Sequence, residues 1–379
     1  MPISEQLVVA VAILRHGEVL VARRAYPPAV AGQWELPGGK VDAAETVEAA
    51  AAREIAEELG CVVRVGSLLQ ASVLLRPGLR LLAAYADLVE GEPVPHEHSA
   101  LRWLGPEDLD DLGWIDADRV FLPELRERLL DGEPLTGGAT EGAVRIGSTV
   151  RRPTGPWTPM VHELLTHLRA VPLAPLPLGR DVRDREVLTY IPGRTIRPDD
   201  ELLSDAQVAS CAAALRELHD GMRSFRPEGE RRWRYGVRAL GSHEVICHND
   251  PGVYNWAFDG ERATGLFDWD MAGPGDPLDD LGFLAWTAVP LYQDLEIAAI
   301  ARRLELLAAA YGDVSAEAVL RAAHRRMTTA CERIAAGIER GDAGMANLAK
   351  VGEPQRTRDR LGVLEAALPV IESALRGGR

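Results

Sequence analysis

The sequence predicts two unlike domains, an α/β layered domain followed by an α+β domain in which helices dominate. Strand-like and helical patterns alternate to about residue 130. A stretch rich in Gly, Pro, Thr and acid, DGEPLTGGATEG, interrupts them at 131–142. Beyond it, apolar residues recur mostly at helical spacing. We therefore place the first domain at 1–132, a linker at 133–142 and the second domain at 143–379.

The composition is that of globular domains with a clear excess of acid. The chain has 379 residues, 46% of them hydrophobic, and a formal net charge of −15. This balance argues against a nucleic-acid polymer or an anionic membrane as partner. No apolar run has the length of a membrane span, and the first residues, MPISEQLVVAVAIL, lack the basic region of a signal peptide. We expect a cytoplasmic protein, and an acidic chain can still bind a phosphorylated small molecule if a metal ion supplies the positive charge.

The first domain is predicted to combine a hairpin, a capped helix and further strands. LVVAVAILRHGEVLVARR predicts two strands around a turn at His16–Gly17. A helix is expected up to Leu59, with Thr46 as its N-cap and Gly60 as its stop. Three strand-like runs follow, CVVRVG, LLQASVLL and LRLLAAYADLVEG, and then a helix near Asp118–Leu130.

The second domain opens with a short strand pair, AVRIGSTVRRP, which turns at Gly147–Ser148. A helix in WTPMVHELLTHL follows, then the segment EVLTYIPG. The remainder is mostly helical, including LSDAQVASCAAALRELHD and several long helices after Leu291. The four cysteines lie far apart with no CxxC pair, so we expect reduced thiols in the core.

One helical turn of the first domain carries three carboxylates. In REIAEELG, Glu54, Glu57 and Glu58 are three and four residues apart, so they are neighbours on a helix and repel one another. A solvated acidic face is the plain interpretation of such a run. Hard divalent cations prefer oxygen ligands, however, and a cation among the carboxylates would offset their repulsion. Glycines before the helix let a loop approach a metal and phosphates closely.

The wider pattern resembles the Nudix box, G-x5-E-x7-R-E-U-x-E-E-x-G-U. Gly39, Glu45 and the segment Arg53–Gly60 stand at its spacing, and only Cys61 departs, where a larger aliphatic residue is usual. GQWELPGGKV resembles the MutT and CTP pyrophosphohydrolase branch of that superfamily. The resemblance covers about Gln6 to Leu130. It implies an α/β/α Nudix sandwich.

By that resemblance, Mg²⁺ or alternatively Mn²⁺ assists water in attacking a nucleoside triphosphate, which gives the monophosphate and pyrophosphate. The branch implies an oxidised purine triphosphate such as 8-oxo-dGTP, or CTP and its analogues. Arg24 would touch the phosphates and Asp118 the base edge, although Asp118 also fits a plain helix N-terminal acid. Arg53 and Glu45 would hold the loop and helix in shape, and the general base would be Glu54 or Glu97. The implied metal ligands are the carbonyl of Gly38 and the side chains of Glu54, Glu57, Glu58 and Glu97.

A second constellation lies in CHNDPGVYN and GLFDWDMAGPGDPLDDLGF. His248 and Asp250 precede Asn255, and Asp268 follows an apolar strand, which is the spacing of phosphotransfer loops. In such loops Asp250 would accept the proton of a substrate hydroxyl, and Asn255 and Asp268 would hold Mg²⁺. Two Asn/Asp turns are the plain interpretation.

These segments, with LRELHD upstream, resemble the aminoglycoside phosphotransferase/choline kinase superfamily. The resemblance implies an α+β protein-kinase-like fold, here with a reduced N-lobe. It also implies ATP or GTP as phosphoryl donor and a small-molecule hydroxyl as acceptor. The acidic balance favours a cationic or polyhydroxylated acceptor.

The N-lobe departs from the kinase pattern. Its strands join through Gly147–Ser148 without a Gly-rich loop. Arg151 or Arg152 stands in for the usual lysine, with Glu163 as a candidate partner, and Tyr190 is expected beside the nucleotide.

Two interpretations therefore stay open. One is a bifunctional enzyme; the other is a monofunctional Nudix hydrolase whose second domain is a ligand-binding or regulatory module. A nucleic-acid or scaffold protein would show a basic patch or an apolar stripe, and the sequence shows neither.

Overall fold

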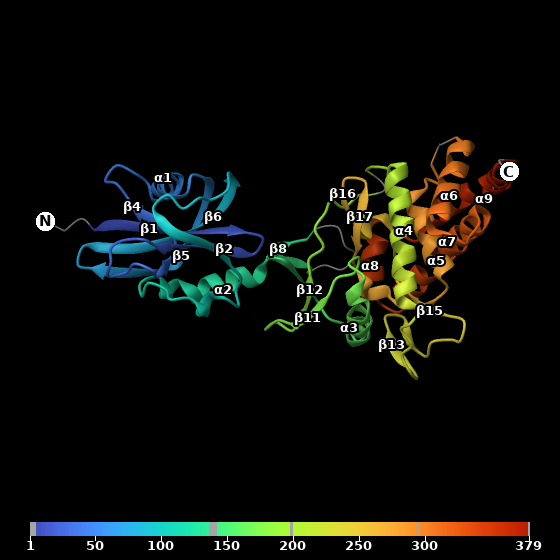
Figure 1. Cartoon of the computed structure of the whole chain (residues 1–379), viewed down its shortest axis with the longest axis horizontal. Helices are drawn as coiled ribbons and strands as arrows, with labels where there is room; N and C mark the ends of the chain where they lie inside the picture. Colours follow the sequence, from blue (N-terminus) through green and yellow to red (C-terminus); the bar gives the residue numbers. More distant parts are fainter. Residues whose placement is uncertain (1–4, 136–141, 198–199, 294–295, 378–379) are drawn as a thin grey trace. The chain divides into compact units, whose positions relative to one another are not determined.

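The computed structural model describes residues 5–135, 142–197, 200–293 and 296–377 (Figure 1). Its contacts divide the chain into two compact units, which meet in sequence between Arg151 and Arg152. We call them the first and the second unit and describe each by itself. The predicted linker, 133–142, lies largely outside the described residues.

The first unit is built on a mixed sheet. In it β3, β2, β1, β6 and β5 follow one another, while β4 also pairs with β1 and β7 with β2. β1 and β6 run parallel, and the other pairs are antiparallel. The strands are β1 (Gln6–Arg15), β2 (Glu18–Arg24), β3 (Trp34–Glu35), β4 (Gly38–Lys40), β5 (Val62–Arg76), β6 (Leu79–Glu90) and β7 (His98–Leu104). The helical segments are α1 (Val47–Leu59), η1 (Leu109–Asp111), η2 (Asp118–Phe121) and α2 (Leu122–Asp131).

The two long helices cover opposite faces of this sheet (Figure 1). Successive side chains of a strand point to opposite faces, so β1 serves two cores. Val9 and Val11 pack in one core with Ile55 of α1. Ala10 packs in the other with Leu125 of α2. The predicted α/β/α layering of the first unit is therefore present.

Local signals in the sequence account for the ends of these elements. His16 and Gly17, between β1 and β2, both have positive φ, as a tight hairpin turn requires. Thr46 caps α1 by accepting from the Ala49 N–H, and Gly60 ends it in the left-handed conformation.

One strand prediction is wrong. CVVRVG and LLQASVLL do not form two strands, because β5 runs continuously from Val62 to Arg76 beside β6. Its register shifts between Val65 and Leu68 and again between Leu68 and Ser72. Irregularities of this kind bend a strand without ending it.

The hairpin of β9 (Val144–Ile146) and β10 (Thr149–Arg152) turns at Gly147–Ser148, as predicted. β8 (Glu133–Pro134) pairs with β9. Contacts group the hairpin, up to Arg151, with the first unit, and the Gly147 N–H donates to the His16 carbonyl at 2.6 Å. The sequence instead places this hairpin at the start of the second domain, at residue 143. The boundary between the domains therefore stays a prediction.

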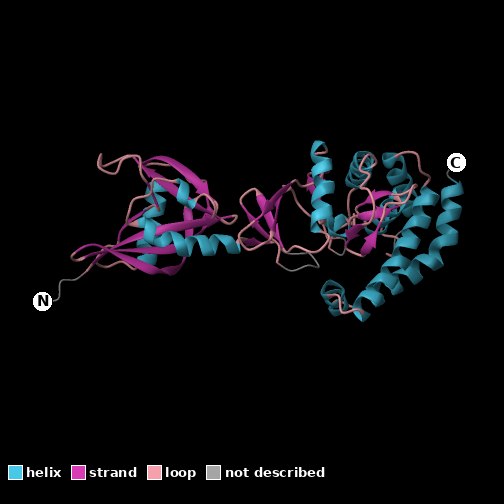
Figure 2. Cartoon of the chain, turned by 90° about the horizontal axis from the view of Figure 1, so that it is seen from below, coloured by secondary structure: helices cyan, strands magenta, loops and turns pink. Residues whose placement is uncertain are grey.

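The second unit is mainly helical, with short strand pairs (Figure 2). Its helical segments are α3 (Thr158–His167), η3 (Leu168–Ala170), α4 (Asp205–Met222), η4 (Val253–Asn255), η5 (Trp269–Met271), α5 (Pro277–Ala288), α6 (Ile297–Tyr311), α7 (Ala316–Glu339), α8 (Ala343–Lys350) and α9 (Gln355–Gly377). Its strands are β11 (Pro177–Arg180), β12 (Glu186–Thr189), β13 (Arg231–Trp233), β14 (Gly236–Arg238), β15 (Val245–Cys247), β16 (Trp256–Asp259), β17 (Arg262–Leu266) and β18 (Gly273–Gly275).

The core of the second unit contains residues of α3, α4, α5, α6, α7 and α9, and it includes the buried Trp256 and Trp269. All four cysteines of the chain are buried and free, as predicted. Every helix within the described ranges is too short or too polar to cross a lipid bilayer.

Helices α5 and α7 pack closely against each other at Gly282. A Cβ added there would lie 2.5 Å from the Ala322 carbonyl carbon, which belongs to the backbone of α7. We expect Gly282→Ala to force the helices apart and lower the free energy of unfolding of the second unit by roughly 1–3 kcal/mol. Scanning calorimetry of the full chain would measure the shift.

The matched control is Gly362→Ala in α9, where an added Cβ meets nothing within 4 Å. Alanine favours a helix over glycine by about 1 kcal/mol, so this variant should be slightly more stable. Equal destabilisation by both substitutions would contradict close packing at Gly282.

Candidate active sites

In the first unit, Arg53 of α1 draws the acidic side chains together. Its guanidinium donates to Glu45 at 3.0 and 3.2 Å, to Glu54 at 3.0 Å and to Glu57 at 3.3 Å. It also donates to the Lys40 carbonyl at 3.1 Å, which ties α1 to the end of β4. The arginine therefore offsets the repulsion that these carboxylates would otherwise suffer.

The glycines of PGG make room for the acids. Gly38 has φ +147°, and its N–H donates to Glu58 Oε2 at 3.1 Å. A Cβ on Gly39 would lie 2.2 Å from the carboxyl carbon of Glu54. The backbone at Gly39 can thus approach the Glu54 carboxylate only because it carries no side chain.

These residues fit a hard divalent cation. The pKa of Glu58 is raised to about 7, mainly by burial; the charges of Glu54 and Glu35 also raise it, while His98 and the Gly38 N–H lower it. A bound cation would favour the ionised form of Glu58 that burial disfavours. Carboxylate and carbonyl oxygens are the ligands that such a cation prefers. Glu97, the further acid expected here, is exposed, and no hydrogen bond or ion pair within the described ranges joins it to α1.

A second group of side chains lies around Glu35. Arg24 donates to Glu35 at 2.6 Å, and His98 Nε2 lies 3.2 Å from its other oxygen. Asp118 is buried and accepts from the Leu36 N–H at 2.8 Å. Burial raises the pKa of Asp118 to about 7, with Glu35 adding to the rise and the Leu36 N–H and Arg24 opposing it.

Sequence reasoning named Arg24 and Asp118 but missed Glu35 and His98. Glu35 lies inside the segment GQWELPGGKV, and His98 directly follows the predicted Glu97. The Nδ1 of the largely buried His98 has no hydrogen-bond partner within the described residues. The group therefore offers a buried acid, a neutral or charged imidazole and a cation to a ligand.

In the second unit, the predicted base Asp250 is held from two sides. Tyr254 donates to its Oδ1 at 2.7 Å, and Asn255 donates to its Oδ2 at 3.1 Å. Burial raises the pKa of Asp250 to about 7, the Asp268 charge adds to this, and Tyr254, Arg326 and Asn255 oppose it. A carboxylate with a pKa near neutrality can accept a proton and release it again at physiological pH.

Of the two arginines proposed to replace the kinase lysine, the structure places Arg152 beside the phosphotransfer acids. It contacts Asp268 at 3.2 Å and Asp270 at 2.5 Å. Burial works to lower the pKa of Arg152, but these carboxylates and Glu186 raise it, so the guanidinium is charged. Arg151 instead pairs with Glu107 at 3.0 Å.

The prediction that Glu163 pairs with this arginine is wrong. Arg152 contacts Glu186 of β12 at 3.0 Å, and His162 of α3 contacts the other Glu186 oxygen at 2.8 Å. Glu163 is exposed because the buried face of α3 carries its apolar residues. Tyr190 lies just after β12 and is half-buried.

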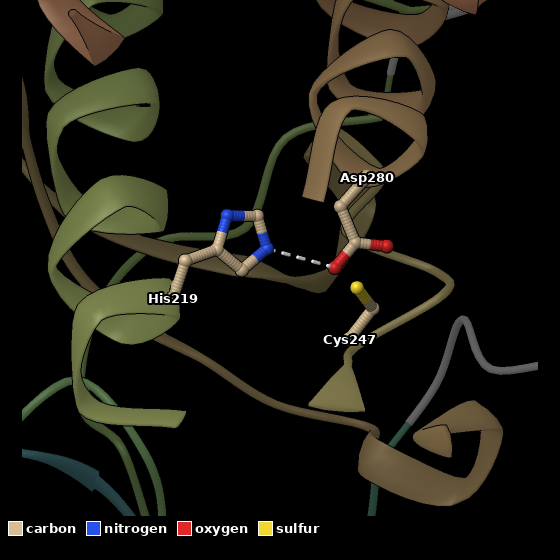
Figure 3. Close-up of side chains that lie close together, drawn as sticks. All are labelled: His219, Cys247 and Asp280. Carbon is tan, nitrogen blue, oxygen red and sulfur yellow. Dashed lines mark hydrogen bonds and ion pairs between the residues drawn. The ribbon is translucent and has the colours of Figure 1, made fainter. Parts of the chain in front are cut away.

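Asp280 of α5 positions the loop that carries Asp250. Its carboxylate accepts the N–H groups of His248 at 2.7 Å and Asn249 at 2.8 Å. His219 Nε2 donates to it at 3.1 Å (Figure 3). Although burial alone would raise the pKa of Asp280, the His219 hydrogen bond brings it below the usual value.

Cys247 completes a cluster with His219 and Asp280 whose ligand atoms lie within 4.8 Å of one another (Figure 3). Burial, and next the charge of Asp280, raise the pKa of the Cys247 thiol well above its usual value. A cysteine binds a metal as its thiolate, which this raised pKa disfavours. The Asp280 carboxylate already accepts hydrogen bonds from three donors. We interpret the cluster as structural.

Comparison with known proteins matches two separate segments of the chain to two different families. Residues 5–125 match the NUDIX domain family, and residues 230–322 match the phosphotransferase enzyme family. A Mycobacterium tuberculosis (strain H37Rv) protein named "Putative 8-oxo-dGTP diphosphatase 2" is 46% identical over 127 residues, which are 33% of this chain and 90% of that protein. The CTP pyrophosphohydrolase of Escherichia coli K12 is 38% identical over 103 residues, 27% of this chain and 76% of that protein.

A third relative is the trifolitoxin immunity protein of Rhizobium leguminosarum bv. trifolii. It is 35% identical over 166 residues, which are 42% of this chain. This chain spans 63% of the length of that relative.

The close approach of Gly39 to Glu54 leads to a prediction. We expect Gly39→Ala to fold but to displace the flexible Glu54 carboxylate, with a loss of roughly 100-fold in Mg²⁺-dependent nucleotide hydrolysis. Gly38→Ala is the matched comparison, because a Cβ there would lie 2.1 Å from the Val9 carbonyl oxygen of the backbone. It should lower the melting temperature instead. Full activity in a folded Gly39→Ala protein would contradict the expected role of Glu54.

The raised pKa of Asp118 predicts that the stability of the first unit depends on pH. An unfolded aspartate ionises near pH 4, while buried Asp118 holds its proton to about pH 7, so the folded first unit loses up to about 4 kcal/mol as pH rises between these values. In Asp118→Asn this loss is absent. We expect the stability of the variant relative to the original chain to increase from pH 4 to pH 8.

Urea unfolding followed by hydrogen exchange of β1 peptides would measure this difference for the first unit alone. Asp116→Asn, which changes an exposed aspartate two residues away, is the control. If the difference in stability between Asp118→Asn and the original chain does not change with pH, Asp118 titrates as an exposed acid.

Proposed function

Because the chain belongs to the Nudix family through its first unit and carries a phosphotransferase-family domain in its second, we propose that it is a bifunctional enzyme. The first unit hydrolyses nucleoside triphosphates to the monophosphate and pyrophosphate. The second transfers a phosphoryl group from ATP or GTP to the hydroxyl of a small molecule. Each activity has its own set of residues.

The observation that supports the first activity is the network of Arg53 and the acids of α1. Glu54, Glu57 and Glu58, with the Gly38 carbonyl, would hold Mg²⁺ or Mn²⁺. The bound cation would polarise the phosphates and lower the pKa of water. Gly39 and Arg53 keep the Glu54 carboxylate at the loop, and Glu58, with a pKa of about 7, is poised between its two protonation states.

In the proposed reaction a water oxygen bonds to phosphorus, and the bond from phosphorus to the pyrophosphate oxygen breaks. The water proton passes to a carboxylate, for which Glu54 and Glu97 stay the candidates. Glu54 is favoured by position, because it lies against the loop while Glu97 is exposed. Arg24 would bind the phosphates.

The nucleotide is proposed to be an oxidised purine triphosphate such as 8-oxo-dGTP, with CTP as the alternative. The names of the relatives point to both. Asp118 would contact the base edge of either nucleotide. When protonated it can donate a hydrogen bond to a base edge, and when ionised it can accept one, while Leu36 fixes its position.

For the second activity, the acceptor hydroxyl gives its proton to Asp250 as its oxygen bonds to the γ-phosphorus. The bond from that phosphorus to the ADP or GDP oxygen breaks. Asn255 and Asp268 would hold Mg²⁺ on the phosphates. Tyr254 and Asn255 orient the base through hydrogen bonds at 2.7 and 3.1 Å.

A second candidate is a Nudix hydrolase whose second unit binds a ligand without transferring phosphate. Two observations favour it. Gly147–Ser148 leaves no Gly-rich loop between β9 and β10, and Arg152 already neutralises Asp268 and Asp270.

Mass spectrometry of the full chain with Mg²⁺ and a nucleotide panel tests both activities. We expect monophosphate and pyrophosphate from 8-oxo-dGTP or CTP, reduced at least 100-fold in Glu57→Gln because a metal ligand is lost. We expect slow formation of ADP from ATP, lost in Asp250→Asn because the base is removed.

Matched controls are Glu48→Gln on an exposed turn of α1 and Asp259→Asn at the exposed end of β16. No turnover of any triphosphate would refute the first activity. ADP formation that persists in Asp250→Asn would refute the second.

A further inference from the structure

The second unit contains a cavity of about 680 Å³ beside the predicted phosphotransfer residues. Asp250, Asn255 and Asp268 line it, together with residues of α7, α8 and α9. Arg152 and Tyr190, which are expected to bind the donor nucleotide, do not line it. Asn255 and Asp268, which would hold Mg²⁺ on the donor phosphates, do line it, so the cavity is placed to present an acceptor to those phosphates.

The lining of this cavity is strongly basic outside the phosphotransfer acids. Its cationic side chains are Arg234, Arg326, Arg333, Lys350, Arg356 and Arg360. Its carboxylates are Asp250, Asp268, Asp270 and Glu353. Three of these four acids belong to the phosphotransfer site, and Glu353 is the fourth. Asp342, which does not line the cavity, forms an ion pair with Arg234 at 3.6 Å.

Arg326 of α7 is the clearest sign of a missing anion. It is 6% exposed and stacks over Phe283, with the guanidinium carbon 5.1 Å from the ring centre. One nitrogen donates to the Asn249 carbonyl at 2.8 Å, but its Nε has no hydrogen-bond partner. No carboxylate within the described ranges forms an ion pair with it, and the charges of Asp250 and Asp280 act on it only at longer range. A further anion in contact would therefore stabilise this buried charge.

Arg333 lies seven residues further along α7, on the same side of the helix. Its guanidinium stacks over Tyr235 at 5.0 Å, and no ion pair within the described part of the second unit neutralises it. Burial, and next the charge of Arg326, lower the pKa of Arg333. Two half-buried or buried arginines that repel each other across one cavity are stabilised by a shared anion.

We propose that this cavity binds an anionic acceptor, a hydroxyl-bearing molecule whose phosphate or carboxylate group contacts Arg326 and Arg333 while its hydroxyl faces Asp250. The proposal rests on the phosphotransfer activity for its reaction, but the anion site stands on its own geometry. Arginine pairs with phosphate and carboxylate through two parallel hydrogen bonds, which gives orientation as well as affinity. The acceptor anion takes no part in the bond changes.

This inference reverses one expectation from the sequence. The acidic balance of the chain favours a cationic or polyhydroxylated acceptor, and the lining of the cavity disfavours the cationic one. A polycationic acceptor would meet Arg326 and Arg333, neither of which forms an ion pair with a carboxylate within the described ranges.

The test is calorimetric titration of the full chain in EDTA, without nucleotide. Glucose 6-phosphate, glucose and glucosamine carry a similar ring with a negative, zero or positive charge, and inorganic phosphate is the minimal anion. We expect glucose 6-phosphate and inorganic phosphate to bind, and glucose and glucosamine to bind at least about tenfold more weakly than glucose 6-phosphate.

Arg333→Gln should weaken glucose 6-phosphate binding at least about tenfold, since a charge-assisted hydrogen bond is lost. Arg326→Lys should weaken it as well, and circular dichroism would show whether each variant is folded. Arg321→Gln, at an exposed position of α7 outside the cavity, is the control and should bind within about twofold of the original chain.

The proposal is overturned if neither anion binds, if glucosamine binds as tightly as glucose 6-phosphate, or if folded Arg333→Gln binds like the original chain. Failure of the phosphotransfer activity gives a different result. In that case the anions bind and respond to Arg333→Gln, while ATP with Mg²⁺ yields no ADP that depends on Asp250.

Discussion

Both candidate sites depend on holding carboxylates together against their mutual repulsion, and each uses one arginine to do so. Arg53 joins Glu45, Glu54 and Glu57 in the first unit. Arg152 joins Glu186, Asp268 and Asp270 in the second. Without a cation, like charges at these distances would push the loops and helices apart. The guanidinium keeps each set in place while leaving carboxylate oxygens for a metal or a phosphate-bound ion.

How much of each site could be predicted from the sequence follows from how far apart its residues lie in the chain. Glu54, Glu57 and Glu58 share one helix, so their spacing alone makes them neighbours. Glu35, His98 and Glu186 come together with their partners only through strand pairing and burial, which no local pattern encodes. The assignment of Glu163 to Arg152 fails for the same reason, because the strand β12 supplies the acid that a kinase takes from a helix.

The fold shows a similar limit. The hairpin at His16–Gly17 and the cap at Thr46 follow from local backbone preferences, and both are present. The continuous β5 could not be predicted from local sequence. Gly66 weakens a strand locally, but pairing with the long strand β6 keeps β5 continuous. Net charge misleads in the same way. A chain of formal charge −15 still gathers six cations around one cavity, since the average conceals where each sign is placed.

The cations of that cavity are almost all arginine, and so are those of the whole chain, which contains only two lysines, Lys40 and Lys350. Lys40 follows the Gly38–Gly39 pair, and Lys350 lines the cavity. The chain thus carries one side-chain amine at each site. Acylation of amines, by a reagent or by an acetyl-transferring enzyme, would remove a charge from either site while leaving every arginine intact.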